Sequence, residues 1–99
     1  MTIQKKAEGD KLVLSIHGRL DTITAPQMEN ELKASLQGIW ELEIDLIELE
    51  YISSAGLRVL LAAQKVMNRQ GTMVIRGANE DIMEIFEVTG FIDILNIEE

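Results

Sequence analysis

The spacing of hydrophobic and polar residues changes repeatedly along the chain between a period of two and a period of about 3.6, which predicts alternating strands and helices. A period-two run over residues 11–18 predicts a strand, and residues 2–6 are expected to pair with it across a turn at Gly9-Asp10. Residues 40–46 predict a strand with one apolar and one acidic face, and residues 72–76 predict an almost continuously apolar strand.

The 3.6-residue period predicts three helices. The first covers residues 26–36 with Thr24 as a plausible cap, and the second covers residues 53–69. The third begins after Asn79 and ends at Gly90, and the short apolar tail that follows is expected to dock back as a strand or turn. The apolar positions expected to face the core are Met28, Leu32, Leu36, Trp40, Leu42, Ile44, Leu46, Leu57, Val59, Leu60, Leu61, Ala63, Val66, Met67, Ile82, Met83, Ile85 and Phe86.

The resulting order is β-β-α-β-α-β-α in a single domain over residues 1–99. Strands separated by helices favour an α/β (α+β) fold with helices packed against a mixed, mostly parallel sheet of four to five strands.

Composition narrows the possible functions. The formal net charge of −8 and the pI near 4.6 argue against a nucleic-acid or anionic membrane surface, and favour a partner with a basic face. The sequence has no cysteine, which excludes disulfides and thiolate chemistry. Because no apolar segment resembles a signal peptide or a membrane span, we expect a cytoplasmic protein.

Common catalytic and cofactor motifs are missing. There is no glycine-rich phosphate loop, and the only histidine, His17, has no neighbouring ligand with which to share a metal. The carboxylates of the strand over residues 40–46 are expected to form a solvated face. A hydrolase triad of Ser54, His17 and Asp21 would need a nucleophile elbow that the sequence lacks. We therefore expect neither an enzyme nor a cofactor or metal site.

The most informative stretch is residues 49–61, which leaves a strand, crosses a short loop and enters a helix with serines at the junction. Structurally, Ser53 or Ser54 would be the N-cap, accepting a hydrogen bond from a first-turn N–H group. The same position suits a phosphate, because free N–H groups and the helix dipole favour negative charge there. Both roles are compatible with one residue.

This stretch resembles the signature of STAS domains of the anti-sigma factor antagonist family. There an acidic residue, the phosphorylated serine, a second hydroxyl residue and Gly-Leu open a helix after a strand. In this register Ser53 takes the acidic place, Ser54 the acceptor place and Ala55 the second hydroxyl place, while Gly56 and Leu57 match outright. Ser53, which replaces the usual acidic residue, is an alternative acceptor. Because Ala55 removes a competing hydroxyl, Ser54 is the expected site.

Two further segments support the resemblance, which extends over essentially the whole chain. Residues 18–22 resemble the loop that opens the family's first helix, with Asp21 close to the acceptor serine. Asp45-Leu46 fits the end of the central strand. The expected partner-binding residues near Ser54 are Asp21, Thr22, Ser53, Gly56, Leu57 and Arg58.

The resemblance implies a phosphoprotein that regulates transcription by partner switching. When unphosphorylated, it would bind an anti-sigma factor that is a serine kinase and so release a sigma factor; phosphorylation of Ser54 would block binding, and a serine phosphatase would restore it. ATP would be held by the kinase. The alternative is a sensor or scaffold module of the same fold, in which the helix N-terminus binds phosphate or a nucleotide reversibly.

Overall fold

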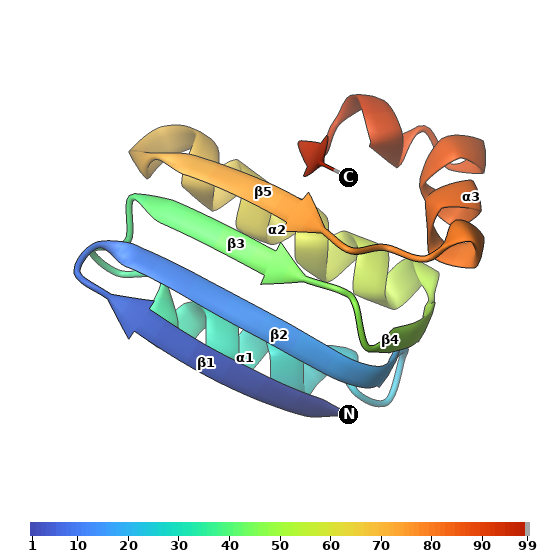
Figure 1. Ribbon diagram of the computed structural model, residues 1–99, viewed down its shortest axis with the longest axis horizontal. Coiled ribbons are helices and arrows are strands. Elements are labelled where there is room, and N and C mark those ends of the chain that lie inside the picture. Colours follow the sequence, from blue (N-terminus) through green and yellow to red (C-terminus); the bar gives the residue numbers. More distant parts are fainter. Residues whose placement is uncertain (99) are drawn as a thin grey trace.

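Six strands, three α-helices and one 3-10 helix make up the computed structural model, which describes residues 1–98 (Figure 1). In chain order they are β1 (Thr2–Glu8), β2 (Lys11–Leu20), α1 (Ala25–Ser35), β3 (Glu41–Asp45), β4 (Leu49–Ile52), α2 (Ser54–Gln70), β5 (Thr72–Arg76), α3 (Glu80–Val88), the 3-10 helix η1 (Phe91–Asp93) and β6 (Ile97–Glu98).

The strands form one mixed sheet in the order β1-β2-β3-β5-β6. β1 is antiparallel to β2, and the remaining pairs are parallel. β4 pairs in parallel with the last residues of β2, after a shift of register between Gly18 and Arg19. β2 therefore pairs with β3 along its first half and with β4 at its carboxyl end.

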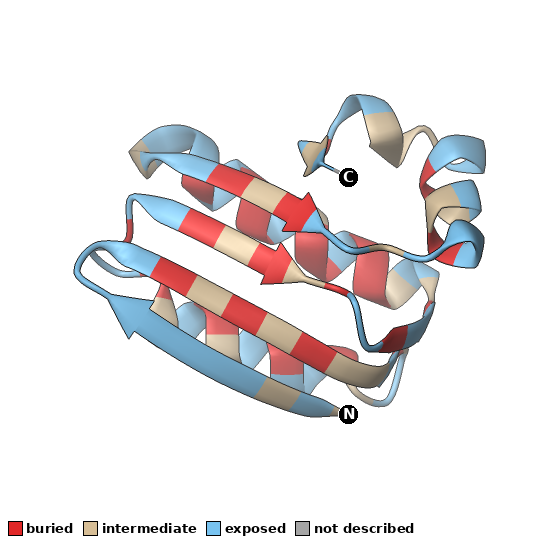
Figure 2. Ribbon diagram, in the orientation of Figure 1, coloured by how far each residue is buried: buried red, intermediate tan, exposed pale blue. Residues whose placement is uncertain are grey.

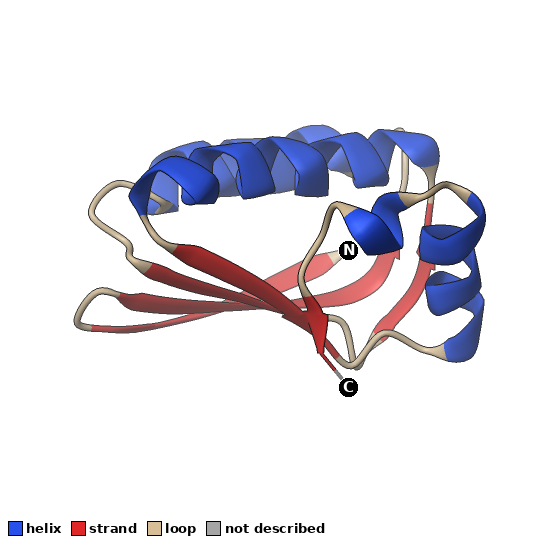
Figure 3. Cartoon of the chain, turned by 90° about the horizontal axis from the view of Figure 1, so that it is seen from above, coloured by secondary structure: helices blue, strands red, loops and turns tan. Residues whose placement is uncertain are grey.

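The helices α1 and α2 lie side by side over one face of the sheet, whereas α3 and η1 lie at one end of it (Figure 3). The core fills the space between the sheet and these two helices. Along β2 and β3 the buried positions alternate with partly exposed ones, as expected for a sheet that packs against helices on only one face (Figure 2). The largest fully buried side chains include Leu14, Ile44, Leu60 and Phe86.

The α/β class and the mixed, mostly parallel sheet predicted from the sequence are confirmed. The predicted helices 26–36 and 53–69 are found within one residue at each end, as Ala25–Ser35 and Ser54–Gln70. The strand Thr72–Arg76 lies where it was predicted. The apolar tail docks back as expected, with Leu95 buried after η1.

The sheet differs from the predicted order by two additional strands, β4 and β6, so it has six strands rather than four to five. β4 has only four residues, and its burial does not alternate: Leu49 and Ile52 are buried and the two residues between them are exposed. β6 has only two residues. Neither segment is long enough to show the period-two pattern of a strand.

Five side chains expected in the core are less buried than predicted, among them Met83 and Ile85 of α3, which are half-buried. Trp40 is 65% exposed, because it precedes β3 at the rim of the core. In α2, Leu61 is half-buried and Val66 is 43% exposed, since the helix packs on the sheet along one side only. Among residues 1–98, no helix combines the length and the apolar character that crossing a membrane requires.

Phe86 anchors α3 to the core and is fully buried. We expect Phe86→Ala to lower the free energy of unfolding by about 3–5 kcal/mol, because truncation leaves a cavity. Val88→Ala, on the same helix at a side chain that is 76% exposed, should change it by less than about 0.5 kcal/mol. Urea denaturation of the two variants measures both changes in the free energy of unfolding. Equal losses for Phe86→Ala and Val88→Ala would contradict the packing of α3 on the core through Phe86.

Candidate functional site

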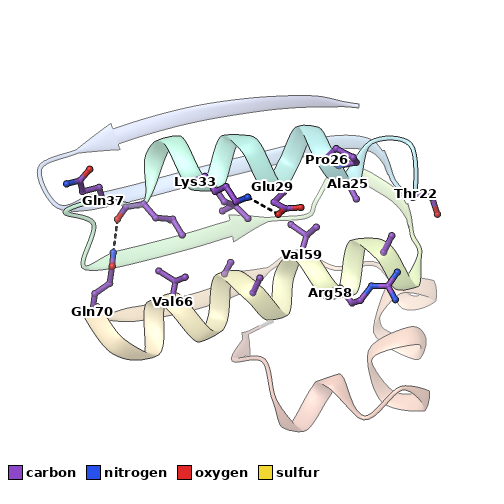
Figure 4. A pocket seen from close by; sticks show the side chains of 15 residues that line it. Thr22, Ala25, Pro26, Glu29, Lys33, Gln37, Arg58, Val59, Val66 and Gln70 are labelled. Carbon is purple, nitrogen blue, oxygen red and sulfur yellow. Dashed lines mark hydrogen bonds and ion pairs between the residues drawn. The ribbon is translucent and has the colours of Figure 1, made fainter.

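The carboxyl ends of β2 and β4 bring the predicted site residues together. Leu20 pairs with Ile52 at the end of the two strands, and the N–H group of Ser53 donates a hydrogen bond of 2.9 Å to the carbonyl of Leu20. The loop that begins at Asp21 and the start of α2 therefore leave the sheet next to each other. The first turns of α1 and α2 lie at this same end of the molecule (Figure 4).

Ser53 and Ser54 have different roles. Ser53 is the N-cap of α2: its backbone is extended, and its hydroxyl oxygen accepts a hydrogen bond of 3.4 Å from the N–H group of Gly56. Ser54 is the first helical residue, and it is exposed. Within residues 1–98, the Ser54 hydroxyl has no intramolecular hydrogen-bond partner. The structure thus resolves the alternative left open by the sequence: Ser53 caps the helix and Ser54 presents its hydroxyl to solvent.

The carboxylate of Asp21 organises the loop between β2 and α1. Its Oδ1 atom accepts hydrogen bonds from the N–H groups of Ile23 and Thr24, at 3.0 and 3.1 Å. The bond from the Thr24 N–H is the main reason that the pKa of Asp21 lies below its usual value of 3.8. Partial desolvation of the Asp21 carboxylate raises its pKa and so opposes this shift. The positive charge of Arg19, whose Nε atom lies 3.7 Å from Oδ2 of Asp21, lowers the pKa further. Asp21 is therefore ionised at neutral pH.

The direction of the pKa shift of Asp21 determines how the stability of the loop depends on pH. A lowered pKa means that the folded state favours the ionised carboxylate of Asp21. The resulting contribution to stability is present above the unfolded pKa, and it is lost as the pH falls through the lower, folded pKa. The loop keeps its hydrogen bonds throughout the physiological range of pH.

Thr24 does not cap α1 through its side chain, contrary to the expectation from the sequence. It occupies the N-cap position but has helical backbone angles and makes no side-chain cap bond. Its hydroxyl instead accepts a hydrogen bond from the Asp21 N–H group at 2.9 Å and donates one to the Arg19 carbonyl at 2.8 Å. Thr24 and Asp21 therefore hold the loop in one conformation through reciprocal bonds.

Gly56 allows α2 to approach the end of β2 closely. A Cβ atom at this position would lie 2.8 Å from the Leu20 side chain and 2.9 Å from the Leu20 carbonyl oxygen. Gly56 and Leu57 are both buried, so they position the site from within, whereas Thr22, Ser54 and Arg58 are exposed at its surface.

A contact between Arg19 and Tyr51 at the edge of the site was not predicted from the sequence. Their positions are paired between β2 and β4, and the Arg19 guanidinium lies over the Tyr51 ring at 4.3 Å from its centroid. Such a contact contributes about 0.5–1 kcal/mol at an exposed site. Recognising it requires the β2–β4 pairing, which the sequence pattern did not predict.

Within residues 1–98, no group of three or more metal-ligating side chains is placed to hold an ion. His17 lies within β2 opposite Thr2, on the strand face that alternates with the buried residues Leu14 and Ile16. The arrangement therefore offers no support for a triad with Ser54.

Comparison with known proteins identifies the family. A family model described as "Mlab, STAS domain" matches residues 3–96. The chain belongs to the STAS domain family. BtrV of Bordetella bronchiseptica is 38% identical over 88 residues, a match that covers 87% of this chain and 76% of BtrV. The anti-sigma-B factor antagonist of Listeria monocytogenes is 34% identical over 97 residues, covering 95% of this chain and 84% of that protein.

Solved structures show the same fold. The anti-sigma factor antagonist SpoIIAA in its unphosphorylated form superposes with a TM-score of 0.77 at 12% identity, covering 99% of this chain and 88% of SpoIIAA. The phosphorylated form of Bacillus SpoIIAA gives a TM-score of 0.76 at 13% identity, covering 99% of this chain and 92% of SpoIIAA. At these identities the likeness concerns the fold alone.

The different environments of the two serines lead to a stability prediction. Ser53→Ala removes the cap of α2 and should lower the free energy of unfolding by about 1 kcal/mol. Ser54→Ala removes an exposed hydroxyl and should change it by less than about 0.5 kcal/mol. Thermal or urea unfolding of both variants measures the difference, and a larger loss for Ser54→Ala would reverse the assignment of the cap.

Proposed function

We propose that this chain is an anti-sigma factor antagonist that is switched by phosphorylation of Ser54. The unphosphorylated chain binds an anti-sigma factor that is also a serine kinase, and so releases a sigma factor. Phosphorylation of Ser54 ends this binding, and a serine phosphatase restores it. The observation that carries the proposal is the exposed hydroxyl of Ser54 at the start of α2, beside the Asp21 loop, in a chain whose relatives include an anti-sigma-B factor antagonist.

Ser54 is a better acceptor than Ser53 for a structural reason. The Ser53 hydroxyl is engaged with the Gly56 N–H group, and Ser53 is half-buried. Adding a phosphate there would remove the cap of α2. A phosphate on Ser54 would extend into solvent at the helix N-terminus, where the dipole favours a negative group by about 0.3–1 kcal/mol. Phosphorylation of Ser54 therefore leaves the fold intact.

Charge alone is sufficient to switch the binding. A phosphate adds about −1.5 to −2 charges, next to the ionised Asp21 and in a chain of formal net charge −8. An unpaired dianion enclosed in a partner interface costs a few kcal/mol. Since about 1.4 kcal/mol corresponds to a tenfold change in affinity, no rearrangement of the domain is needed.

The chain acts in this scheme as substrate and ligand, not as catalyst. ATP and its metal ion belong to the kinase. The site of action is the cytoplasm, where sigma factors engage RNA polymerase.

The acceptor assignment is tested by labelling. Incubation with the cognate anti-sigma factor kinase and ATP should add one phosphate to the chain, detected as an intact-mass increase and mapped by peptide mass spectrometry to Ser54. Ser54→Ala should abolish the increase, whereas Ser53→Ala should retain it. Phosphate on Ser53 would overturn the assignment, and reversible nucleotide binding without a mass increase would favour a sensor.

Arg58 is an exposed positive group one helical turn after Ser54, and it is placed to bind a carboxylate of the partner. We expect Arg58→Glu to reduce affinity for the anti-sigma factor by about tenfold or more. Lys65→Glu makes the same change of charge two turns further along α2, and it should have a much smaller effect. Titration calorimetry compares the two variants. Equal, small losses would mean that the partner responds only to the overall charge.

A further inference from the structure

A groove of about 740 Å³ runs between α1 and α2 on the outer side of the helical layer (Figure 4). It exists because α2 presents small side chains, among them Ala55, Ala62 and Ala63, toward α1. Val66 also lines the groove and is 43% exposed, although it is a large apolar residue. The groove is therefore an apolar surface that the fold leaves uncovered.

The two ends of the groove differ. At one end the side-chain amide of Gln70 donates hydrogen bonds of 2.6 and 2.7 Å to the carbonyls of Leu36 and Ile39, which ties α2 to the end of α1. At the other end lie Thr22, in the loop before α1, and Arg58, four residues after Ser54 begins α2 (Figure 4). The groove thus extends continuously from the proposed phosphorylation site along α2.

The dimensions of the groove suit a helix. The lining residues of α2 extend from Ala55 to Gln70, a length of about 22 Å at 1.5 Å per residue, or about four turns of a partner helix. An amphipathic helix places apolar residues at spacings of three and four along one side, and such a side fits an apolar groove between two helices.

The charged side chains at the rim of the groove indicate where a bound partner carries a negative charge. On α1, Lys33 is paired with Glu29 at 3.1 Å. Arg58, at the end of the groove opposite Gln70, has no ion-pair partner within residues 1–98. An unpaired guanidinium beside an apolar groove favours a partner that carries a carboxylate at that end.

We propose that this groove binds an amphipathic helix of the anti-sigma factor, with its apolar side between α1 and α2 and a carboxylate directed at Arg58. The inference rests on the proposed function, and it extends that interface from the surroundings of Ser54 along the side of α2 that lines the groove, which does not include Lys65. It also connects the switch to the groove. Ser54 and Arg58 are four residues apart on α2, so a phosphate on Ser54 lies within reach of the guanidinium and competes with the partner's carboxylate.

A pair of matched valine substitutions tests the groove. Val66→Asp places a charge in the groove, and Val88→Asp places the same charge on an exposed valine of α3, outside it. Titration with the purified anti-sigma factor whose kinase activity labels Ser54 should show at least a tenfold loss of affinity for Val66→Asp and less than a twofold change for Val88→Asp. Ala62→Trp, which fills the groove without adding charge, should also reduce the affinity at least tenfold. Circular dichroism confirms that each variant is folded.

The outcomes separate this inference from the proposed function. If Ser54→Asp weakens binding while Val66→Asp and Ala62→Trp bind like the wild type, the groove inference is overturned and the phosphorylation switch stands. If the wild type does not bind the anti-sigma factor, both fail. If Val66→Asp abolishes self-association in sedimentation equilibrium but leaves partner binding unchanged, the groove is covered by a second copy of this chain, and the inference is likewise overturned.

Discussion

The site depends on one close approach, that of the first turn of α2 to the carboxyl end of β2. Gly56 lies so near Leu20 that a Cβ atom would fall 2.9 Å from the Leu20 carbonyl oxygen, and the same carbonyl accepts the N–H group of Ser53. This contact fixes α2 against β2, and therefore places the Asp21 loop beside the start of the helix. Any larger residue at position 56 would have to displace backbone atoms, which cannot give way as a flexible side chain can.

In the proposed function, the two consecutive serines divide a structural and a regulatory task. Ser53 uses its hydroxyl within the fold, as the cap of α2, and Ser54 leaves its hydroxyl exposed. A site that must be modified and restored repeatedly benefits from this separation, because the modification then changes charge without removing a bond that stabilises the helix. Asp21 adds a fixed negative charge nearby, held by backbone N–H groups.

Much of the fold could be predicted because its long elements show clear periods: β2 alternates over residues 11–17, and α2 repeats its apolar side over 17 residues. β4 could not be predicted, because the burial of its four residues does not alternate and its pairing with β2 depends on the register shift between Gly18 and Arg19. The sequence predicted the serines at the start of a helix with Asp21 near them, and the role of Ser54 as phosphate acceptor stays a prediction. The bonds of Thr24 are local to the loop, and they use the hydroxyl that was expected to cap α1. The contact of Arg19 with Tyr51 and the groove arise from tertiary packing, which no local pattern encodes.

In the proposed function, a phosphate on Ser54 acts as a local charge and not through refolding of the domain. The most direct measurement is titration calorimetry of the stoichiometrically phosphorylated and the unmodified chain against the anti-sigma factor, together with amide chemical shifts of both forms. We expect phosphorylation to weaken binding by at least tenfold, with chemical-shift changes confined to the first turn of α2 and the Asp21 loop. Equal affinities, or shift changes throughout β3, β5 and α3, would contradict it.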